Sequence, residues 1–161
     1  MNHAHLRQLV LTVLFSLVAK VSMAQQTPSY IPTEENLKAR KEFADSKLGI
    51  FIHWGIYSMF AQGEWYMTNA NIDNKEYAKA ASAFYPVNFD AKAWVSAIKA
   101  AGAKYICFTS RHHDGFSMWN TAQSDYNIVD ATPFGCDVIK ELADECHRQG
   151  IKLHLYYSHI D

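Results

Sequence analysis

The sequence lacks any excess of basic residues, because its 161 residues include 15 Lys and Arg against 16 Asp and Glu, for a formal net charge of −1. Binding to a nucleic-acid backbone needs clustered positive charge, so we expect no nucleic-acid partner. Cysteine is also scarce, with three residues in total. Cys136 and Cys146 fall in one expected helix, about 15 Å apart along its axis. That separation is too large for a disulfide, and the sequence therefore indicates no disulfide framework.

A long apolar run is missing near the N-terminus. Leu9 to Ala19 is apolar, but its length is about half of the roughly 20 residues that span a bilayer. This stretch follows Arg7 and precedes Ser22-Met23-Ala24, which has small residues at the two positions that a signal peptidase reads. Residues 1–24 are therefore typical of a secretory signal peptide. We expect an exported protein, periplasmic or secreted, without a stable membrane anchor.

Three apolar runs are typical of buried strands, and they cover about residues 47–54, 105–110 and 152–156. Helical patterns cover about residues 33–45, 75–83, 90–102 and 135–149. Thr33 and Asp90 are the expected caps of the first and third of these helices. Because strands alternate with helices and each strand is apolar throughout, the sequence predicts a parallel sheet that is buried on both faces.

Two architectures combine parallel strands with functional loops at the carboxyl ends of the strands: the (β/α)₈ barrel and the open, doubly wound sheet. No Gly-x-Gly-x-x-Gly follows any strand, and polar groups recur after every strand, whereas an open sheet would gather them at one switch point. We therefore predict an α/β fold of the (β/α)₈ TIM-like barrel type. Such a barrel needs about 250 residues. Residues 25–161 are little more than half of that, so we expect them to form only about the first three βα units of a truncated barrel.

Polar and aromatic side chains follow each expected strand at its carboxyl end. His53-Trp54-Gly55 follows the first strand, the adjacent His112-His113 follows the second, and Tyr157-Ser158-His159 follows the third. The loop at residues 55–74 is long for a connection from strand to helix, and it contains Gly63-Glu64-Trp65-Tyr66. Carboxyl ends of parallel strands meet at one end of a barrel, so we expect these groups to lie at the same end.

In their order and approximate spacing, four motifs resemble those of the family 29 glycoside hydrolases, the α-L-fucosidases. They are His53-Trp54-Gly55, Glu64-Trp65-Tyr66, His112 to Phe116 with Trp119, and Tyr156-Tyr157-Ser158. Each motif alone is weak, but together and in this order they are highly specific, and the likeness covers about residues 31–161. The resemblance implies an exo-acting, retaining glycosidase that releases terminal L-fucose from a fucosylated glycan or glycoside. We expect no cofactor and no metal.

The resemblance also implies a substrate-binding role for six residues: His53, Glu64, Trp65, His112, His113 and Tyr156. A neutral imidazole offers one donor and one acceptor to sugar hydroxyls, and a carboxylate accepts from two hydroxyls. Trp65 offers a flat apolar face to the C–H edge or the C6 methyl of fucose. A retaining glycosidase uses two carboxyl groups about 5 Å apart. In the family both come from beyond the third strand, so we expect no catalytic residue in this chain and no activity from the chain as a separate polypeptide.

Two other functions remain open from the residues. A non-catalytic fucose-binding protein would keep the pocket and lack the chemistry. A metal-dependent barrel hydrolase would use the histidine pair as ligands, although no His-x-His follows the first strand and no carboxylate clearly completes a ligand set. For the other residues of the motifs we expect loop packing or pocket walls from Trp54, Phe116 and Trp119, and a core position for Tyr157. We expect Asp114 to fix its own loop or to orient a histidine.

Overall fold

The structure is a computed structural model, and it describes residues 30–159. The contacts between residues divide the chain into two compact units, with the boundary between Arg40 and Lys41. The expected signal peptide, residues 1–24, lies outside the described residues. Within residues 30–159, no helix has the length and the apolar character needed to cross a membrane.

The helix α2 (Glu34–Asp45) spans the boundary between the two units. It begins after Thr33, whose side-chain oxygen accepts a hydrogen bond from the Asn36 N–H at 3.2 Å. Glu34 and Glu35 lie in its first turn, where the helix dipole favours acidic side chains. The helix therefore begins at the cap that the sequence predicts.

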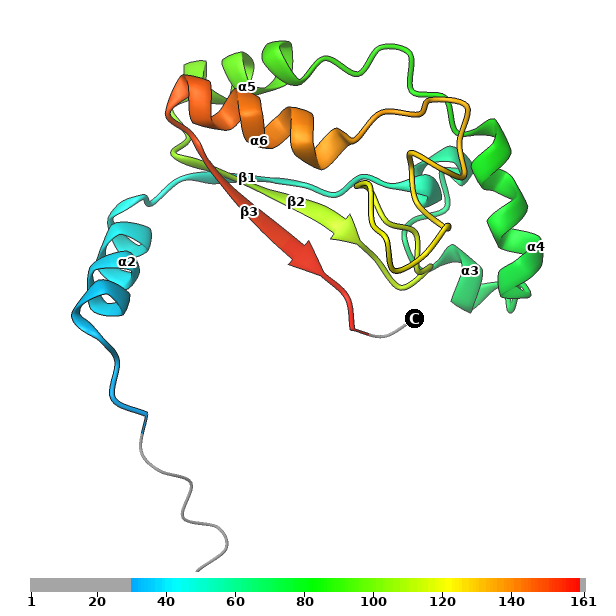
Figure 1. Ribbon diagram of the computed structural model, residues 1–161, viewed down its shortest axis with the longest axis horizontal. Helices are drawn as coiled ribbons and strands as arrows, with labels where there is room; N and C mark the ends of the chain where they lie inside the picture. Colours follow the sequence, from blue (N-terminus) through cyan, green and yellow to red (C-terminus); the bar gives the residue numbers. More distant parts are fainter. Residues whose placement is uncertain (1–29, 160–161) are drawn as a thin grey trace, which may run out of the picture. The chain divides into compact units, whose positions relative to one another are not determined.

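The sheet of residues 41–159 has three parallel strands in chain order (Figure 1): β1 (Gly49–Ile52), β2 (Tyr105–Arg111) and β3 (Lys152–Tyr157). Tyr105 of β2 lies opposite Gly49 on one side and Lys152 on the other. The register between β2 and β3 shifts between Thr109 and Arg111, at the carboxyl end of β2. The parallel sheet of the sequence prediction is confirmed.

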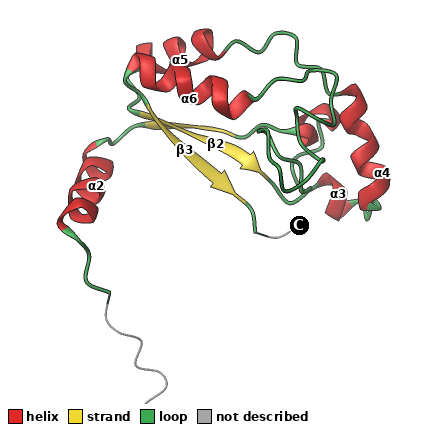
Figure 2. Cartoon of the chain, in the orientation of Figure 1, coloured by secondary structure: helices red, strands yellow, loops and turns green. Residues whose placement is uncertain are grey.

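Helices connect these strands. The long connection after β1 holds η1 (Ile56–Phe60), α3 (Tyr66–Asn69), α4 (Asn74–Ala78) and η2 (Lys79–Ala83). The two longer helices, which lie side by side over the sheet (Figure 2), are α5 (Ala91–Ala100) and α6 (Val138–Gln149). Asp90 caps α5 by accepting from the Ala93 N–H at 2.9 Å, and Asp137 caps α6 by accepting from the Lys140 N–H at 2.8 Å.

The core lies between β2 and these two helices. Ile106 and Phe108 of β2, Val95 of α5 and Leu142 of α6 are all completely buried. Residues two apart on a strand share one face, so Ile106 and Phe108 both point toward the helices. Burying one such side chain contributes about 1.5–3 kcal/mol, which holds α5 and α6 on the sheet.

The outer strands are less buried than the sequence predicts. Phe51 of β1 is 53% exposed and Leu155 of β3 is 52% exposed. Tyr157, predicted to be a core residue, is 46% exposed. The reason is the position of these strands, because β1 and β3 each have one neighbouring strand whereas β2 has two. The prediction that every strand is buried on both faces is therefore wrong for β1 and β3 within the described residues.

Candidate functional site

Side chains from all three strands converge at the carboxyl end of the sheet. His53 follows β1, His112 and His113 follow β2, and Tyr156 lies near the end of β3. The ring centroids of His53 and His112 are 4.9 Å apart, and those of His112 and His113 are 4.4 Å apart. The Tyr156 ring stacks on His112 at 5.5 Å, with 20° between the planes. The structure thus brings these four predicted residues into one cluster.

Two neighbouring residues of a regular strand point to opposite faces, so His112 and His113 can share a cluster only where the strand has ended. The structure meets this condition, because β2 ends at Arg111 after its register shift. The chain then turns through Gly115, whose φ of 73° is in the left-handed region that favours glycine.

The long loop after β1 adds the other two predicted residues. The Trp65 ring lies 3.9 Å from the His113 ring and 6.2 Å from the His112 ring, measured between centroids. Trp65 remains 43% exposed. Glu64 is partly buried, and its negative charge raises the pKa of His112. The loop therefore places an aromatic ring against the imidazoles and the charge of Glu64 within electrostatic range of His112.

His112 is the buried centre of this cluster. It is 5% exposed, and its Nδ1 has no hydrogen-bond partner among the described residues. Burial, together with the neighbouring His113 and His53, lowers the pKa of His112 to about 4 against the opposing effect of Glu64. His112 is therefore a neutral imidazole at pH 7, with one donor and one acceptor nitrogen.

A serine of the third strand end orients His113. The Ser158 hydroxyl lies 2.8 Å from Nδ1 of His113, and the Ser158 N–H donates to the Arg111 carbonyl at 3.0 Å. The backbone of β2 thus fixes the position of Ser158, and Ser158 in turn fixes the ring of His113. Ser158 is part of the Tyr156-Tyr157-Ser158 motif, but the sequence assigns it no role.

Tyr57 is a second residue that sequence analysis misses. It lies in η1, is 4% exposed, and its ring centroid is 5.5 Å from that of His53 and 5.4 Å from that of His112. Burial raises the pKa of its phenol. The only signal in the sequence is an aromatic residue shortly after His53-Trp54-Gly55, within the long loop.

The remaining residues of the motifs pack the loops. Trp54 contacts Phe84, Phe89 and Trp94 at ring centroid distances of 5.7, 5.8 and 5.3 Å, as expected of a packing residue. Asp114 is 8% exposed, and its Oδ1 accepts from the Phe116 N–H at 3.0 Å. Asp114 thus fixes its own loop, and Phe116 is a buried core residue.

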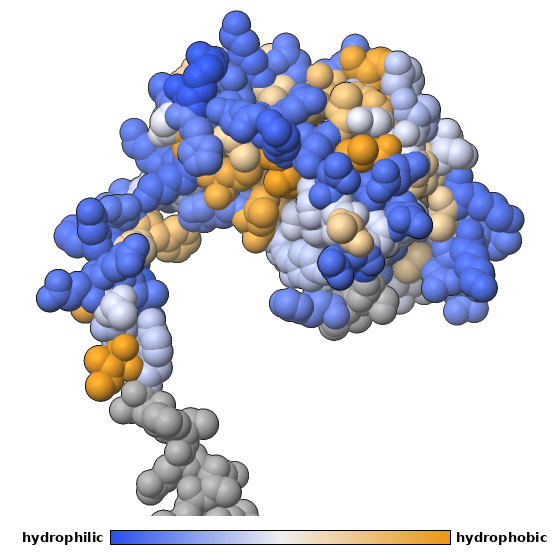
Figure 3. Space-filling model, in the orientation of Figure 1, coloured by the Kyte–Doolittle hydropathy of each residue, from blue (hydrophilic) through white to orange (hydrophobic). Residues whose placement is uncertain are grey.

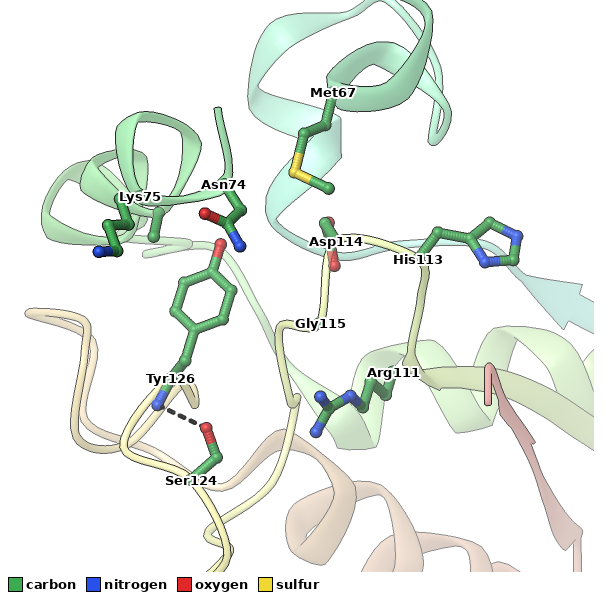
Figure 4. Close-up of a pocket in the computed structure, with 10 residues that line it drawn as sticks. Met67, Asn74, Lys75, Arg111, His113, Asp114, Gly115, Ser124 and Tyr126 are labelled. Atoms are coloured by element: carbon green, nitrogen blue, oxygen red, sulfur yellow. Dashed lines mark hydrogen bonds between the residues drawn. The ribbon is translucent and has the colours of Figure 1, made fainter. Parts of the chain in front are cut away.

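A cavity of about 310 Å³ lies beside the cluster, between the segment from Met67 to Ala78 and the loop after β2 (Figure 4). Of the six predicted residues, His113 alone lines it, and in Figure 4 the His113 ring points away from Tyr126 and Asn74. The six residues therefore form a rim at the carboxyl end of the sheet that touches this cavity only at His113.

A metal site is not formed in the described part of the chain. Among residues 30–159, no three His, Cys, Asp or Glu side chains are arranged to hold a metal ion. Nδ1 of His113 is already within hydrogen-bond distance of Ser158.

The fold and the rim together define an α/β protein with a cluster of polar and aromatic side chains at the carboxyl end of a parallel sheet. A family model described as Alpha-L-fucosidase matches residues 17–161. The chain belongs to the α-L-fucosidase family.

Individual relatives agree with this assignment. The chain is 34% identical to the α-L-fucosidase of Dictyostelium discoideum, over 94% of this chain and 38% of that protein, and 35% identical to the plasma α-L-fucosidase of Homo sapiens, over 84% and 33%. A solved α-L-fucosidase of Lactobacillus casei, in complex with α-L-fucose, is 43% identical with a TM-score of 0.70, covering 73% of this chain and 39% of that one. This chain thus spans between a third and two-fifths of the length of these relatives.

Proposed function

We propose that this chain provides half of the sugar pocket of an exo-acting α-L-fucosidase. That enzyme is a retaining glycoside hydrolase and releases terminal L-fucose from a fucosylated glycan or glycoside. The observation that carries the proposal is the convergence of three imidazoles, an indole and a phenol on one rim at the carboxyl ends of three parallel strands. Active sites of (β/α)₈ barrels lie at this end of the sheet.

The chemistry of the rim suits a deoxy sugar. Neutral His112, with an Nδ1 that lacks a protein partner among the described residues, can bond a ring hydroxyl as donor or acceptor. Glu64 accepts from two hydroxyls in charge-assisted hydrogen bonds. The ring of Trp65 packs on the apolar edge of fucose, which includes the C6 methyl. His53, His113 and Tyr156 complete the contacts from the other strand ends.

The surrounding architecture in this proposal is a (β/α)₈ barrel. The described order of strand, helix, strand, helix and strand corresponds to its first three βα units, so residues 25–161 are the N-terminal part of the catalytic barrel. The half-exposed Phe51 and Leu155 on the outer strands are where neighbouring elements of the barrel would pack. The greater length of the relatives supports this view.

Hydrolysis with retention needs a nucleophilic carboxylate and an acid/base carboxyl group about 5 Å apart. Of the acidic residues in the motifs, Glu64 has the simpler role of a hydroxyl acceptor, and Asp114 is buried and bonded to its own loop. The catalytic pair therefore comes from later elements of the barrel, and this chain by itself does not hydrolyse fucosides. We also propose that the protein is exported, secreted or periplasmic, after removal of residues 1–24.

The test uses the full-length protein that contains this chain, with a chromogenic aryl α-L-fucoside as substrate. We expect release of the aryl group, and we expect His112→Ala to lower kcat/KM by about 10- to 100-fold, since it removes a sugar hydrogen bond and the stacking partner of Tyr156. His147→Ala is the matched control, because His147 is an exposed residue of α6.

An active protein in which both variants behave alike would refute the site. If the full-length protein binds L-fucose but releases no aryl group, the proposed function of an enzyme is wrong and that of a fucose-binding protein takes its place.

A further inference from the structure

The Thr109 hydroxyl makes three hydrogen bonds, and hydrogen-bond chemistry assigns the direction of each. Thr109 lies in β2 and is 1% exposed. Its Oγ1 is 2.7 Å from the Trp54 carbonyl oxygen, 3.0 Å from the Trp54 nitrogen and 3.0 Å from the Tyr57 phenol oxygen. A hydroxyl has one hydrogen and two lone pairs. The carbonyl can only accept and the backbone N–H can only donate, so Tyr57 is the donor of the third bond.

Besides its hydrogen bond to Thr109, the Tyr57 ring packs closely against other residues. It lies 5.5 Å from the His53 ring and 5.4 Å from the His112 ring, and these two rings are 4.9 Å from each other, so Tyr57 packs against a pair of imidazoles that follow two different strands. Gly55 leaves the room for this ring, because a Cβ at that position would lie 2.8 Å from Cε1 of Tyr57. Such a contact is too short for a real Cβ, and the close approach requires glycine.

We infer that Tyr57 is a positioning residue of the proposed fucose pocket, which holds the rings of His53 and His112 in place by packing against both while its hydroxyl is fixed by Thr109. The inference rests on the proposed function. The Tyr57 hydroxyl is used in its bond to Thr109, whereas Nδ1 of His112 has no partner among the described residues, so Tyr57 acts through the two imidazoles. Thr109 links Tyr57 to the ends of both β1 and β2, because it lies in β2 and its hydroxyl also binds both backbone groups of Trp54, which follows β1.

The test measures steady-state kinetics of the full-length protein on an aryl α-L-fucoside. Tyr57→Phe keeps the ring and removes the hydroxyl, so we expect KM to rise about three- to tenfold while kcat stays within about twofold. Thr109→Val should raise KM at least as much, and Thr109→Ser, which keeps the hydroxyl, should restore it. The double variant Tyr57→Phe/Thr109→Val should match Thr109→Val, because both changes remove one shared bond.

Tyr77→Phe is the matched control. Tyr77 is also a buried tyrosine, but its hydroxyl has no hydrogen-bond partner among residues 30–159 and its ring is not in the rim. We expect its KM to equal that of the unsubstituted protein. Should Tyr57→Phe fail to fold, the comparison of Thr109→Val with Thr109→Ser decides in the same way.

An active parent whose Tyr57→Phe variant keeps its KM, or whose Thr109→Ser variant is no better than Thr109→Val, overturns the inference alone. A parent that releases no fucose overturns the proposed function, and the inference falls with it.

Discussion

Burial acts on two titratable groups of the loop after β2, His112 and Asp114. It lowers the pKa of His112 to about 4 from an ordinary value of 6.5, and it raises the pKa of Asp114 to about 6 from 3.8. Both shifts favour the uncharged form of the side chain. Near pH 5, each group is therefore mainly neutral in the folded protein, and the loop that presents the imidazoles carries neither of these two charges.

The difference between the folded-state and unfolded-state pKa of Asp114 makes its contribution to stability depend on pH. Its folded-state pKa lies above its unfolded value, so its contribution to stability is fully present below about pH 3.8 and is lost as pH rises through about 6. Asparagine keeps an oxygen for the Phe116 N–H and carries no charge. We expect Asp114→Asn to match the parent in free energy of unfolding near pH 4 and to exceed it by up to about 3 kcal/mol at pH 7.

Denaturant unfolding of the full-length protein at these two pH values measures the difference. The contribution of His112 has the opposite sign, since its depressed pKa costs stability as pH falls from 6.5 to about 4. His112 is present in both proteins, so its effect cancels in the comparison. A variant less stable than the parent at pH 7 would show that the Asp114 carboxylate is favoured in its charged form.

The hydrogen bond between Ser158 and His113 predicts a change in affinity. Ser158→Ala removes the group that orients the ring at Nδ1, so the imidazole loses part of its fixed direction toward the sugar. We expect L-fucose to bind the full-length protein about three- to tenfold more weakly, as measured by titration calorimetry. Ser82→Ala is the control, because the Ser82 hydroxyl donates to the Lys79 carbonyl in an exposed turn. Equal losses in the two variants would contradict the role of Ser158.

At the scale of elements, the sequence predicts best what adjacent residues determine. The cap at Asp90 is such a case, because a side chain three residues from its N–H partner forms the contact. The start of α6 shows the limit of this approach. The sequence predicts that this helix starts near Gly135. In the structure it begins at Val138, after Asp137, whose carboxylate accepts from the Lys140 N–H.

The six predicted site residues could be found because each lies at the end of an apolar run or within a recognisable motif. Tyr57 lies outside the motifs, and Ser158 lies within one, but the sequence indicates no role for either. Their partners, Thr109 and His113, are 52 and 45 positions away in the sequence. Only the register of β1, β2 and β3 brings these pairs together, and residue spacing carries no information about that register.

The pairing of β1 with β2 contains a close contact that predicts a loss of stability. Gly49 lies opposite Tyr105, and a Cβ on Gly49 would be 2.1 Å from Cζ of the Tyr105 ring. We expect Gly49→Ala to lower the free energy of unfolding of the full-length protein by about 1–3 kcal/mol, because the ring must move away from the strand. Denaturant unfolding measures this loss.

A second substitution identifies the cause. Tyr105→Leu removes the ring, so the double variant Gly49→Ala/Tyr105→Leu should be more stable than the sum of the two single losses predicts. Strictly additive losses would mean that the ring is not what the new Cβ meets.

At the scale of the whole molecule, apolar surface lines the outer strands. A groove of about 420 Å³ between α6 and β3 has apolar walls that include Ile139, Leu153 and Leu155. Figure 3 shows apolar surface beneath α6 along β3. Phe51 is half-exposed on β1, the other outer strand. Unpaired strand edges and contiguous apolar patches both promote association between chains.

We therefore expect residues 25–161, produced as a separate polypeptide, to self-associate and to unfold without a single cooperative transition. Leu155→Lys places a charge on the exposed edge and should raise the monomer fraction in analytical ultracentrifugation. Leu37→Lys adds the same charge on α2, where Leu37 is 51% exposed, and should leave association unchanged. A monomer that unfolds in one cooperative step would contradict the proposed barrel, because three strands and their helices would then suffice for a stable fold.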